Sequence, residues 1–178
     1  MKKICIAALF LFMAFAFTRA GENQVISPDG RLIVTVSVEN GLPVYQVTHN
    51  GKLFLKNSPL GLKMDLGDCT RELTMQEKQS QEKIETNYQL PNIKKSSVHY
   101  EAREGVFAFL KEGKVIFDVI FRVSNNDVAF RYQVYPQGER LSCVIEQEAT
   151  GFVFPDSTTT FLCPQSKPMV GFARTMPS

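Results

Sequence analysis

The sequence predicts an all-β fold, an antiparallel β-sandwich, and three observations support that prediction. Apolar and polar residues alternate with a period of two through most of the chain after residue 20, as in strands with one buried face. Turn residues recur about every 8–12 positions, the spacing typical of sandwiches. No stretch shows the 3.6-residue period of an amphipathic helix. The chain, with no internal repeat and no low-complexity linker, is therefore expected to form a single domain.

The first 20 residues resemble a secretory signal peptide. Lys2 and Lys3 precede the unbroken apolar run Ile4–Phe17, and Thr18-Arg19-Ala20 offers a small-x-small cleavage site. The run is shorter than the roughly 18 residues of a membrane-spanning helix. We therefore expect cleavage near Ala20, no membrane span afterwards, and a periplasmic or secreted domain over residues 21–178. The alternative is an uncleaved N-terminal anchor.

Net charge argues against a nucleic-acid partner. The chain of 178 residues has 20 Lys and Arg against 18 Asp and Glu. Removing Lys2, Lys3 and Arg19 with the signal leaves 17 basic and 18 acidic residues. Nucleic-acid binding relies on clustered basic side chains that displace counterions from phosphates, and a near-neutral chain does not favour it.

The first strands follow from turn chemistry and alternation. Ser27-Pro28-Asp29-Gly30 forms a turn, after which a strand places Leu32, Val34, Val36 and Val38 on one face. Asn40-Gly41 and Asn50-Gly51 predict hairpins, because both residue types tolerate the positive φ that tight hairpin turns require. The strands expected around these turns cover 32–38, 44–49, 52–55 and 60–66.

The polar segment 69–84 interrupts the alternation. It lacks a sustained apolar stripe, so we predict a long, exposed connection between sheets rather than a short solvated helix. Strands are expected to resume in order over 85–90, 97–104, 106–111, 114–123, 128–135, 141–148 and 158–162. Glu112-Gly113 and Asn125-Asn126-Asp127 supply two of the turns between them.

Three cysteines remain after the signal: Cys69, Cys143 and Cys163. A Cys143–Cys163 disulfide is possible in an oxidising compartment. Unbridged thiols in the core are the favoured interpretation, because both residues fall in strand-like runs. No pair of cysteines has the spacing of metal ligands, and no histidine lies near enough in sequence to complete a site.

Candidate catalytic groups are few. His49 adjoins a hairpin turn and His99 lies in an alternating strand, so both are expected to be exposed strand histidines. Glu146 and Glu148 could pair for acid–base work or hold Ca²⁺, although a solvated sheet face explains them equally well. Arg131, between two aromatic residues, is expected to make a structural pair. We assign no catalytic, cofactor-binding or metal-binding residue in this chain.

The aromatic residues give no clear sequence signal of a sugar-binding site. Sugar sites commonly offer an aromatic platform flanked by amides and carboxylates, and this chain has no tryptophan. Its five tyrosines fall mostly in strands, where core or edge packing is the default: Tyr45, Tyr88, Tyr100, Tyr132 and Tyr135.

Three stretches together resemble the N-terminal domain of glycoside hydrolase family 97, exported α-glycosidases typical of Bacteroidetes. The stretches, in order, are Ser27–Gly30 with Ser58–Leu62, then Phe121–Tyr132, then Cys163–Met169 with Gly171–Thr175. Each stretch alone is weak evidence for the family, and the three stretches in this order are more specific. In the second stretch Asp127 is followed directly by Val128, where the family more often has an intervening glycine. This departure bears on the geometry of the local turn and not on the resemblance.

The resemblance implies a three-part enzyme. A β-super-sandwich, similar to galactose mutarotase, precedes a (β/α)₈ barrel and a small β-domain. The barrel carries the catalytic carboxylates, and a Ca²⁺ sits at the domain junction of the full-length enzyme. Residues 21–178 would then be a partial, truncated sandwich whose strand edges and apolar face are exposed. No Ca²⁺ ligand is carried over to this chain.

The function implied by the resemblance is that of a non-catalytic module of an exported α-glycosidase. It would contribute to carbohydrate binding and domain packing, with an α-linked oligosaccharide and the missing barrel as its partners. The chain alone is expected to be inactive, because glycoside hydrolysis needs two positioned carboxyl groups. Two alternatives remain: a free-standing sandwich that binds carbohydrate without cleaving it, and a purely structural exported β-module.

Overall fold

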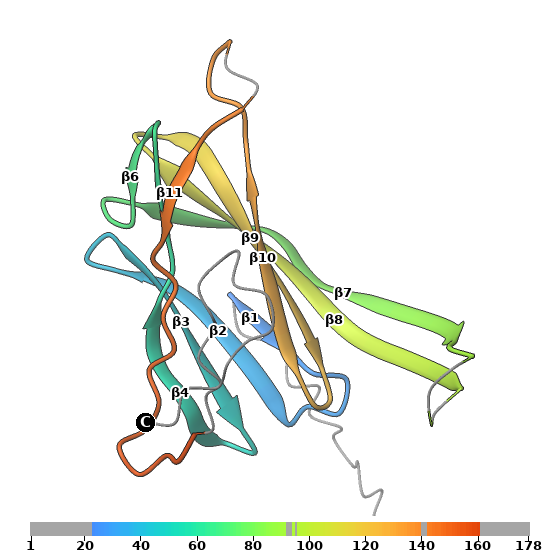
Figure 1. Ribbon diagram of the computed structural model, residues 1–178. Coiled ribbons are helices and arrows are strands. Elements are labelled where there is room, and N and C mark those ends of the chain that lie inside the picture. Colours follow the sequence, from blue (N-terminus) through green and yellow to red (C-terminus); the bar gives the residue numbers. More distant parts are fainter. Residues whose placement is uncertain (1–22, 92–93, 95, 140–141, 161–178) are drawn as a thin grey trace, which may run out of the picture.

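The structure is a computed structural model that describes residues 23–91, 94, 96–139 and 142–160. All regular elements in these ranges are β-strands, and all strand pairs are antiparallel. They form three sheets, ordered β1-β2-β3-β4, β10-β9-β8-β7 and β11-β5-β6 (Figure 1). The predicted antiparallel sandwich is confirmed.

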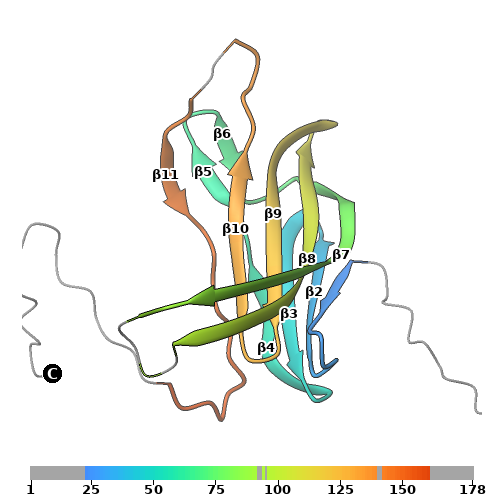
Figure 2. The same ribbon diagram turned by 90° about the vertical axis from the view of Figure 1, so that its right-hand side faces the viewer.

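The strand bounds follow the chain order. They are β1 Gln24–Ile26, β2 Leu32–Glu39, β3 Leu42–His49, β4 Lys52–Pro59, β5 Leu62–Met64, β6 Gly67–Cys69, β7 Thr74–Gln89, β8 Ser97–Lys111, β9 Lys114–Ser124, β10 Val128–Val134 and β11 Ile145–Glu148. The two four-stranded sheets face each other, with β9 and β10 lying over β2 and β3 (Figure 2).

The first sheet forms as the turn residues predict. Asn40 and Gly41 have φ angles of 52° and 80°, and Asn50 and Gly51 have 50° and 72°, so both hairpin turns use the left-handed region. Leu32, Val34 and Val36 on β2 are buried because their shared face meets the second sheet. The short β1 was not predicted, since Val25 is its only fully buried residue and one position gives no alternation.

The second sheet supplies most of the aromatic core. Phe107 and Phe109 on β8 and Phe117 and Phe121 on β9 are completely buried. The predicted strands 97–104 and 106–111 are one strand, β8, that passes through Gly105. A side chain there would not fit, because a Cβ on Gly105 would lie 2.5 Å from the Val25 side chain. Glycine in this strand therefore permits close approach of the two sheets.

The exposed connection predicted over 69–84 is wrong. Most of that segment lies in β7, which pairs with β8 over nearly its whole length. The two strands continue beyond β9, whose last partner on β8 is Ala102, and project from the sandwich as a two-stranded arm (Figure 1). This arm of residues 84–89 and 97–101 falls almost entirely within the strands predicted over 85–90 and 97–104. The missed part of β7 precedes it at the edge of the sheet, where register shifts between Glu77 and Glu82 interrupt the alternation.

The third sheet is built from short strands where longer ones were predicted. The strand expected over 60–66 shrinks to β5, because Gly61 adopts a φ of 136° and breaks the extended run. The strand expected over 141–148 shrinks to β11. Residues 158–160 form no strand, and residues 161–162 lie outside the described ranges.

A non-strand segment, residues 149–153, joins the third sheet to the first. The Ala149 N–H donates to the Gly61 carbonyl at 2.9 Å, and the Gly151 N–H donates to the Pro59 carbonyl at 3.0 Å. The Lys56 N–H donates to the Val153 carbonyl at 2.8 Å. The segment therefore runs along β4 and brings its own side chains to the side of the sandwich between β4 and β10. No helix in the described part of the chain could cross a membrane.

Candidate functional site: an aromatic cleft with a polar rim

A cleft of about 490 Å³ opens between the β2–β4 region of the first sheet and the turn that joins β9 to β10. Its volume falls within the range of small-molecule sites, about 300–1,000 Å³. Four separate parts of the chain meet there. The lining residues are Arg31, Leu32, Tyr45, Val47, His49, Phe54, Leu55, Asn125, Asn126, Asp127, Val128, Phe130, Phe152 and Phe154.

The inner wall of the cleft is aromatic. Tyr45 is only 1% exposed, and its ring centroid lies 5.7 Å from that of Phe130. Phe54 and Phe152 are 53% and 59% exposed, although each packs against another ring of the cleft. The Phe54 ring meets Phe154 edge-on at 6.3 Å, and the Phe152 ring meets Tyr45 edge-on at 6.5 Å. The exposed rings are therefore held by neighbouring rings.

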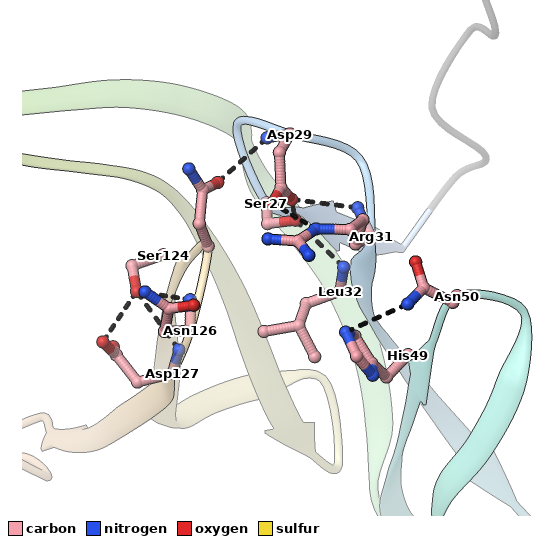
Figure 3. A network of polar contacts seen from close by, with 10 residues as sticks. Ser27, Asp29, Arg31, Leu32, His49, Asn50, Ser124, Asn126 and Asp127 are labelled. Carbon is pink, nitrogen blue, oxygen red and sulfur yellow. Dashed lines mark hydrogen bonds and ion pairs between the residues drawn. The ribbon is translucent and has the colours of Figure 1, made fainter.

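One side of the rim is the Ser27–Arg31 turn, drawn in Figure 3. The Ser27 hydroxyl donates to Asp29 Oδ1 at 2.7 Å, and the Arg31 N–H donates to the same oxygen at 3.0 Å. Arg31 Nε donates to Asp29 Oδ2 at 2.6 Å. The Leu32 N–H donates to the Ser27 hydroxyl at 2.9 Å. Asp29 thus closes the turn and positions Arg31 at the cleft.

The opposite side of the rim is the turn between β9 and β10. The Ser124 hydroxyl donates to Asp127 Oδ2 at 2.6 Å and accepts the N–H groups of Asn126 and Asp127, each at 3.2 Å (Figure 3). The Asp29 N–H donates to Asn125 Oδ1 at 2.9 Å. This last bond ties the two turns together across 96 residues of sequence and sets the spacing of the rim.

Electrostatics divide the cleft into a charged rim and a neutral wall. The hydrogen bond from the Ser27 hydroxyl, followed by that from the Arg31 N–H, lowers the pKa of Asp29 to about 2. Burial raises the pKa of Tyr45 to about 12. At neutral pH Asp29 is therefore ionised against Arg31, while Tyr45 keeps its proton.

The low pKa of Asp29 predicts an acid-sensitive contribution to stability. Because its pKa in the folded state lies below the unfolded value, the stabilisation is present above about pH 4 and is lost as the pH falls through about 2. In Asp29→Asn we expect the urea midpoint to lie below that of the parent at pH 7, and the difference to shrink towards pH 2. A pH-independent difference between the two midpoints would contradict this expectation.

The sequence-predicted histidines are both exposed, as expected. His49 lies at the rim of the cleft, where its Nε2 is 3.3 Å from the Asn50 amide nitrogen. His99 lies on the β7–β8 arm, where its Nδ1 is 2.7 Å from Asn87 Oδ1. The structure therefore does not bring the two imidazoles to one site.

The remaining candidates also stay apart from the cleft. Glu146 and Glu148 are exposed on β11, and a bulge between Ile145 and Gln147 interrupts the simple alternation that would pair them. Arg131 is exposed on β10. Cys69 and Cys143 are free thiols, as favoured, and Cys163 lies outside the described ranges.

A buried carboxylate on the outer face of the second sheet was missed by sequence reasoning. Asp118 is only 3% exposed, and its Oδ2 accepts hydrogen bonds from Lys78 Nζ at 2.9 Å and the Tyr135 hydroxyl at 2.6 Å. Lys78 also lies 4.5 Å from the centre of the Tyr135 ring. The three residues come from β7, from β9 and from the segment after β10. The group pins the edge strand to the sheet, and its Tyr135 also lines a pocket of about 270 Å³ together with Leu66 and Cys143.

Within the described ranges no three His, Cys, Asp or Glu side chains gather as a metal site. The cleft offers one carboxylate, Asp127, at its lining, whereas glycoside hydrolysis uses two facing carboxyl groups. The cleft has aromatic rings on one side and amide, imidazole, guanidinium and carboxylate groups on the other.

Comparison with known families gives one match that covers most of the chain. The sequence model of the Glycosyl-hydrolase 97 N-terminal family matches residues 25–175. A probable retaining α-galactosidase of Streptomyces bingchenggensis (strain BCW-1) is 30% identical over 146 residues, which are 82% of this chain and 22% of that protein.

Solved structures agree with the sequence matches. The crystal structure of a β-arabinopyranosidase is 46% identical, with a TM-score of 0.76 over 88% of this chain and 25% of that chain. A glycoside hydrolase family 97 enzyme from Pseudoalteromonas sp. strain K8, in complex with panose, is 26% identical, with a TM-score of 0.68 over 75% of this chain and 20% of that chain. The chain thus spans a quarter or less of the length of these relatives.

Proposed function

The chain belongs to the glycosyl-hydrolase 97 N-terminal family, and from this premise we propose that it is the β-sandwich module of an exported α-glycosidase. In this role it contributes to carbohydrate binding and to packing against a catalytic barrel. The observation that carries the proposal is the difference in coverage. The matches include 82–88% of this chain but only 22–25% of an α-galactosidase and a β-arabinopyranosidase. The rest of such an enzyme is its natural partner.

The described side chains support a non-catalytic role. The cleft lining holds a single carboxylate, Asp127, whereas glycoside hydrolysis uses two. A calcium ion, implied for full-length relatives by the resemblance, does not fit the described residues, which offer no cluster of three or more acidic, His or Cys side chains. No step of the proposal involves that ion.

Export is the second part of the proposal. It rests on the basic start and the apolar run of residues 1–20. N-terminal sequencing of the protein recovered from the periplasm or medium of a Gram-negative host is expected to begin near Gly21. Recovery of only uncleaved, cell-associated protein would contradict export with cleavage.

A chimaera tests the packing role. The matching quarter of the β-arabinopyranosidase is replaced by residues 25–175 of this chain, a graft that its 46% identity favours. We expect the chimaera to hydrolyse nitrophenyl β-arabinopyranoside, while the same enzyme without that quarter and the isolated 178-residue chain release no nitrophenol above background.

Two results would overturn the proposal. One is a chimaera as inactive as the enzyme that lacks the quarter, although the parent enzyme is active in the same assay. The other is turnover of nitrophenyl α-galactoside, α-glucoside or β-arabinopyranoside by the isolated chain that a change such as Glu148→Gln abolishes. That second result would place chemistry on the sandwich itself.

A further inference from the structure

We propose that the aromatic cleft is a binding site for one pyranose ring of a neutral oligosaccharide, held between the exposed rings of Phe54 and Phe152 and the Asn125–Asp127 turn. The choice of a carbohydrate rests on the proposed function. The choice of this cleft rests on its geometry, because it joins an apolar wall to a polar rim within a volume of about 490 Å³, as small-ligand sites do.

The apolar wall suits the C–H face of a sugar ring. Phe54 and Phe152 are each more than half exposed, yet edge-on contacts to Phe154 and Tyr45 hold their rings. Exposed rings that are already held lose little conformational freedom on binding, so the ordering cost is small. Isolated aromatic side chains on the surface would lack this preorganisation.

The rim suits the hydroxyl groups of the ring. The Asn126 side-chain amide makes no hydrogen bond to any other described residue, and Asp127 uses only Oδ2, in its bond with Ser124. Arg31 binds Asp29 through Nε, which leaves its terminal nitrogens without a partner among the described residues. Donors and acceptors of both kinds therefore remain at the edge of the aromatic wall, as recognition of hydroxyls requires.

The charge balance selects a neutral ligand. Arg31 is offset by Asp29 at 2.6 Å, and Asp127 adds a further negative charge to the lining, so a phosphate or carboxylate group would be repelled. A fully apolar ligand such as an acyl chain would cover the Asn126 amide and the free Asp127 oxygen without replacing their hydrogen bonds to water, which costs free energy. A sugar ring can pack a C–H face on the aromatic wall while its hydroxyl groups form hydrogen bonds with the polar rim.

Calorimetric titration of the full chain with methyl α-D-galactopyranoside and methyl α-D-glucopyranoside tests the site. We expect saturable binding of at least one glycoside, with a Kd of the order of 1 mM. Phe152→Ala is expected to weaken binding about tenfold or more, since it removes one face of the site. Asn126→Ala, on an exposed turn, is expected to weaken binding without altering the fold. Tyr88→Ala is the matched control, because Tyr88 is an exposed aromatic residue on the β7–β8 arm, and it should bind like the parent.

The inference is overturned if titration with both glycosides to roughly a hundred times the expected Kd gives no heat beyond dilution. It is equally overturned if binding is the same in the parent, Phe152→Ala and Asn126→Ala, each shown to be folded by circular dichroism. These outcomes are distinguishable from failure of the proposed function. If the chimaera is active but the isolated chain binds neither glycoside, only the assignment of the cleft as a sugar site is refuted.

Discussion

Phe121→Ala is expected to lower the free energy of unfolding by about 3–5 kcal/mol, the usual cost of removing a buried aromatic ring. Phe121 is fully buried on β9 and lies at the meeting point of the two large sheets. Its ring centroid is 5.6 Å from Tyr45, 6.2 Å from Phe107 and 5.3 Å from Phe130. Because domains of this size are stable by only about 5–15 kcal/mol, a large share of the total would be lost.

Urea unfolding followed by circular dichroism measures this loss. Phe54→Ala is the control, because the same ring is removed from a half-exposed position, and its cost is expected to stay within about 1 kcal/mol. Equal shifts of the two midpoints would mean that the contacts of Phe121 do not form the central core.

Gly61→Ala is expected to destabilise the chain by about 2–6 kcal/mol, the sum of overpacking and backbone strain. A Cβ at this position would lie 2.9 Å from both the Cys69 carbonyl oxygen and the Thr70 Cα. Both are backbone atoms that cannot rotate away. In addition, Gly61 has a φ of 136°, which residues with a side chain rarely adopt.

The same position holds three segments together. The Gly61 N–H donates to the Tyr132 hydroxyl at 2.9 Å, and that hydroxyl lies 2.7 Å from Thr150 Oγ1. The Gly61 carbonyl accepts from the Ala149 N–H. Any shift of the Gly61 backbone to relieve the clash would therefore stretch bonds to β10 and to residues 149–150. Loss of ordered signals in that segment, seen by NMR, should accompany the lower stability.

Gly51→Ala provides the matched comparison. Gly51 also has a positive φ, 72°, but nothing lies within 4 Å of an added Cβ. Only the conformational cost of about 1–2 kcal/mol is then expected. If Gly61→Ala were no more destabilising than Gly51→Ala in denaturant unfolding, the close approach at Gly61 would not matter to the fold.

Elements whose signals are local could be predicted from the sequence. The turns at Asn40-Gly41 and Asn50-Gly51 form with the positive φ angles that Asn and Gly tolerate, since two adjacent residues determine the turn chemistry. At Glu112-Gly113, where both φ angles are also positive, only the glycine signals the turn. The buried face of β2 follows from alternation, because the opposing sheet covers one face along most of its length. The inward residues of β9 also alternate, although residues 117–121 are buried on both faces.

Elements with an irregular register could not be predicted in this way. β7 was missed over residues 74–84, where it lies at the sheet edge and its register shifts between Glu77 and Glu82, whereas its far half in the arm was predicted as a strand. The division of β8 at Gly105 was wrong for a different reason. Glycine is a frequent breaker, and only the position of Val25 across the core shows why it is needed there.

The residues of the cleft could not be grouped into one site from the sequence alone. Arg31, His49, Asn126 and Phe152 lie in four separate parts of the sequence, and no local motif connects them. The bond from the Asp29 N–H to Asn125 Oδ1 that brings two of these segments together spans 96 residues. His49 could be assigned correctly to an exposed strand end, but its place beside an aromatic wall depended on tertiary structure.

The polar composition that hid β7 from hydrophobicity patterns also has a protective effect. β7 is an edge strand, and such a strand presents free N–H and C=O groups that can template the addition of foreign chains. Lys78 and Lys83 sit along it, and its irregular register disrupts a flat ladder. The irregular register and the charged composition of this edge would therefore disfavour the pairing of a second chain with it.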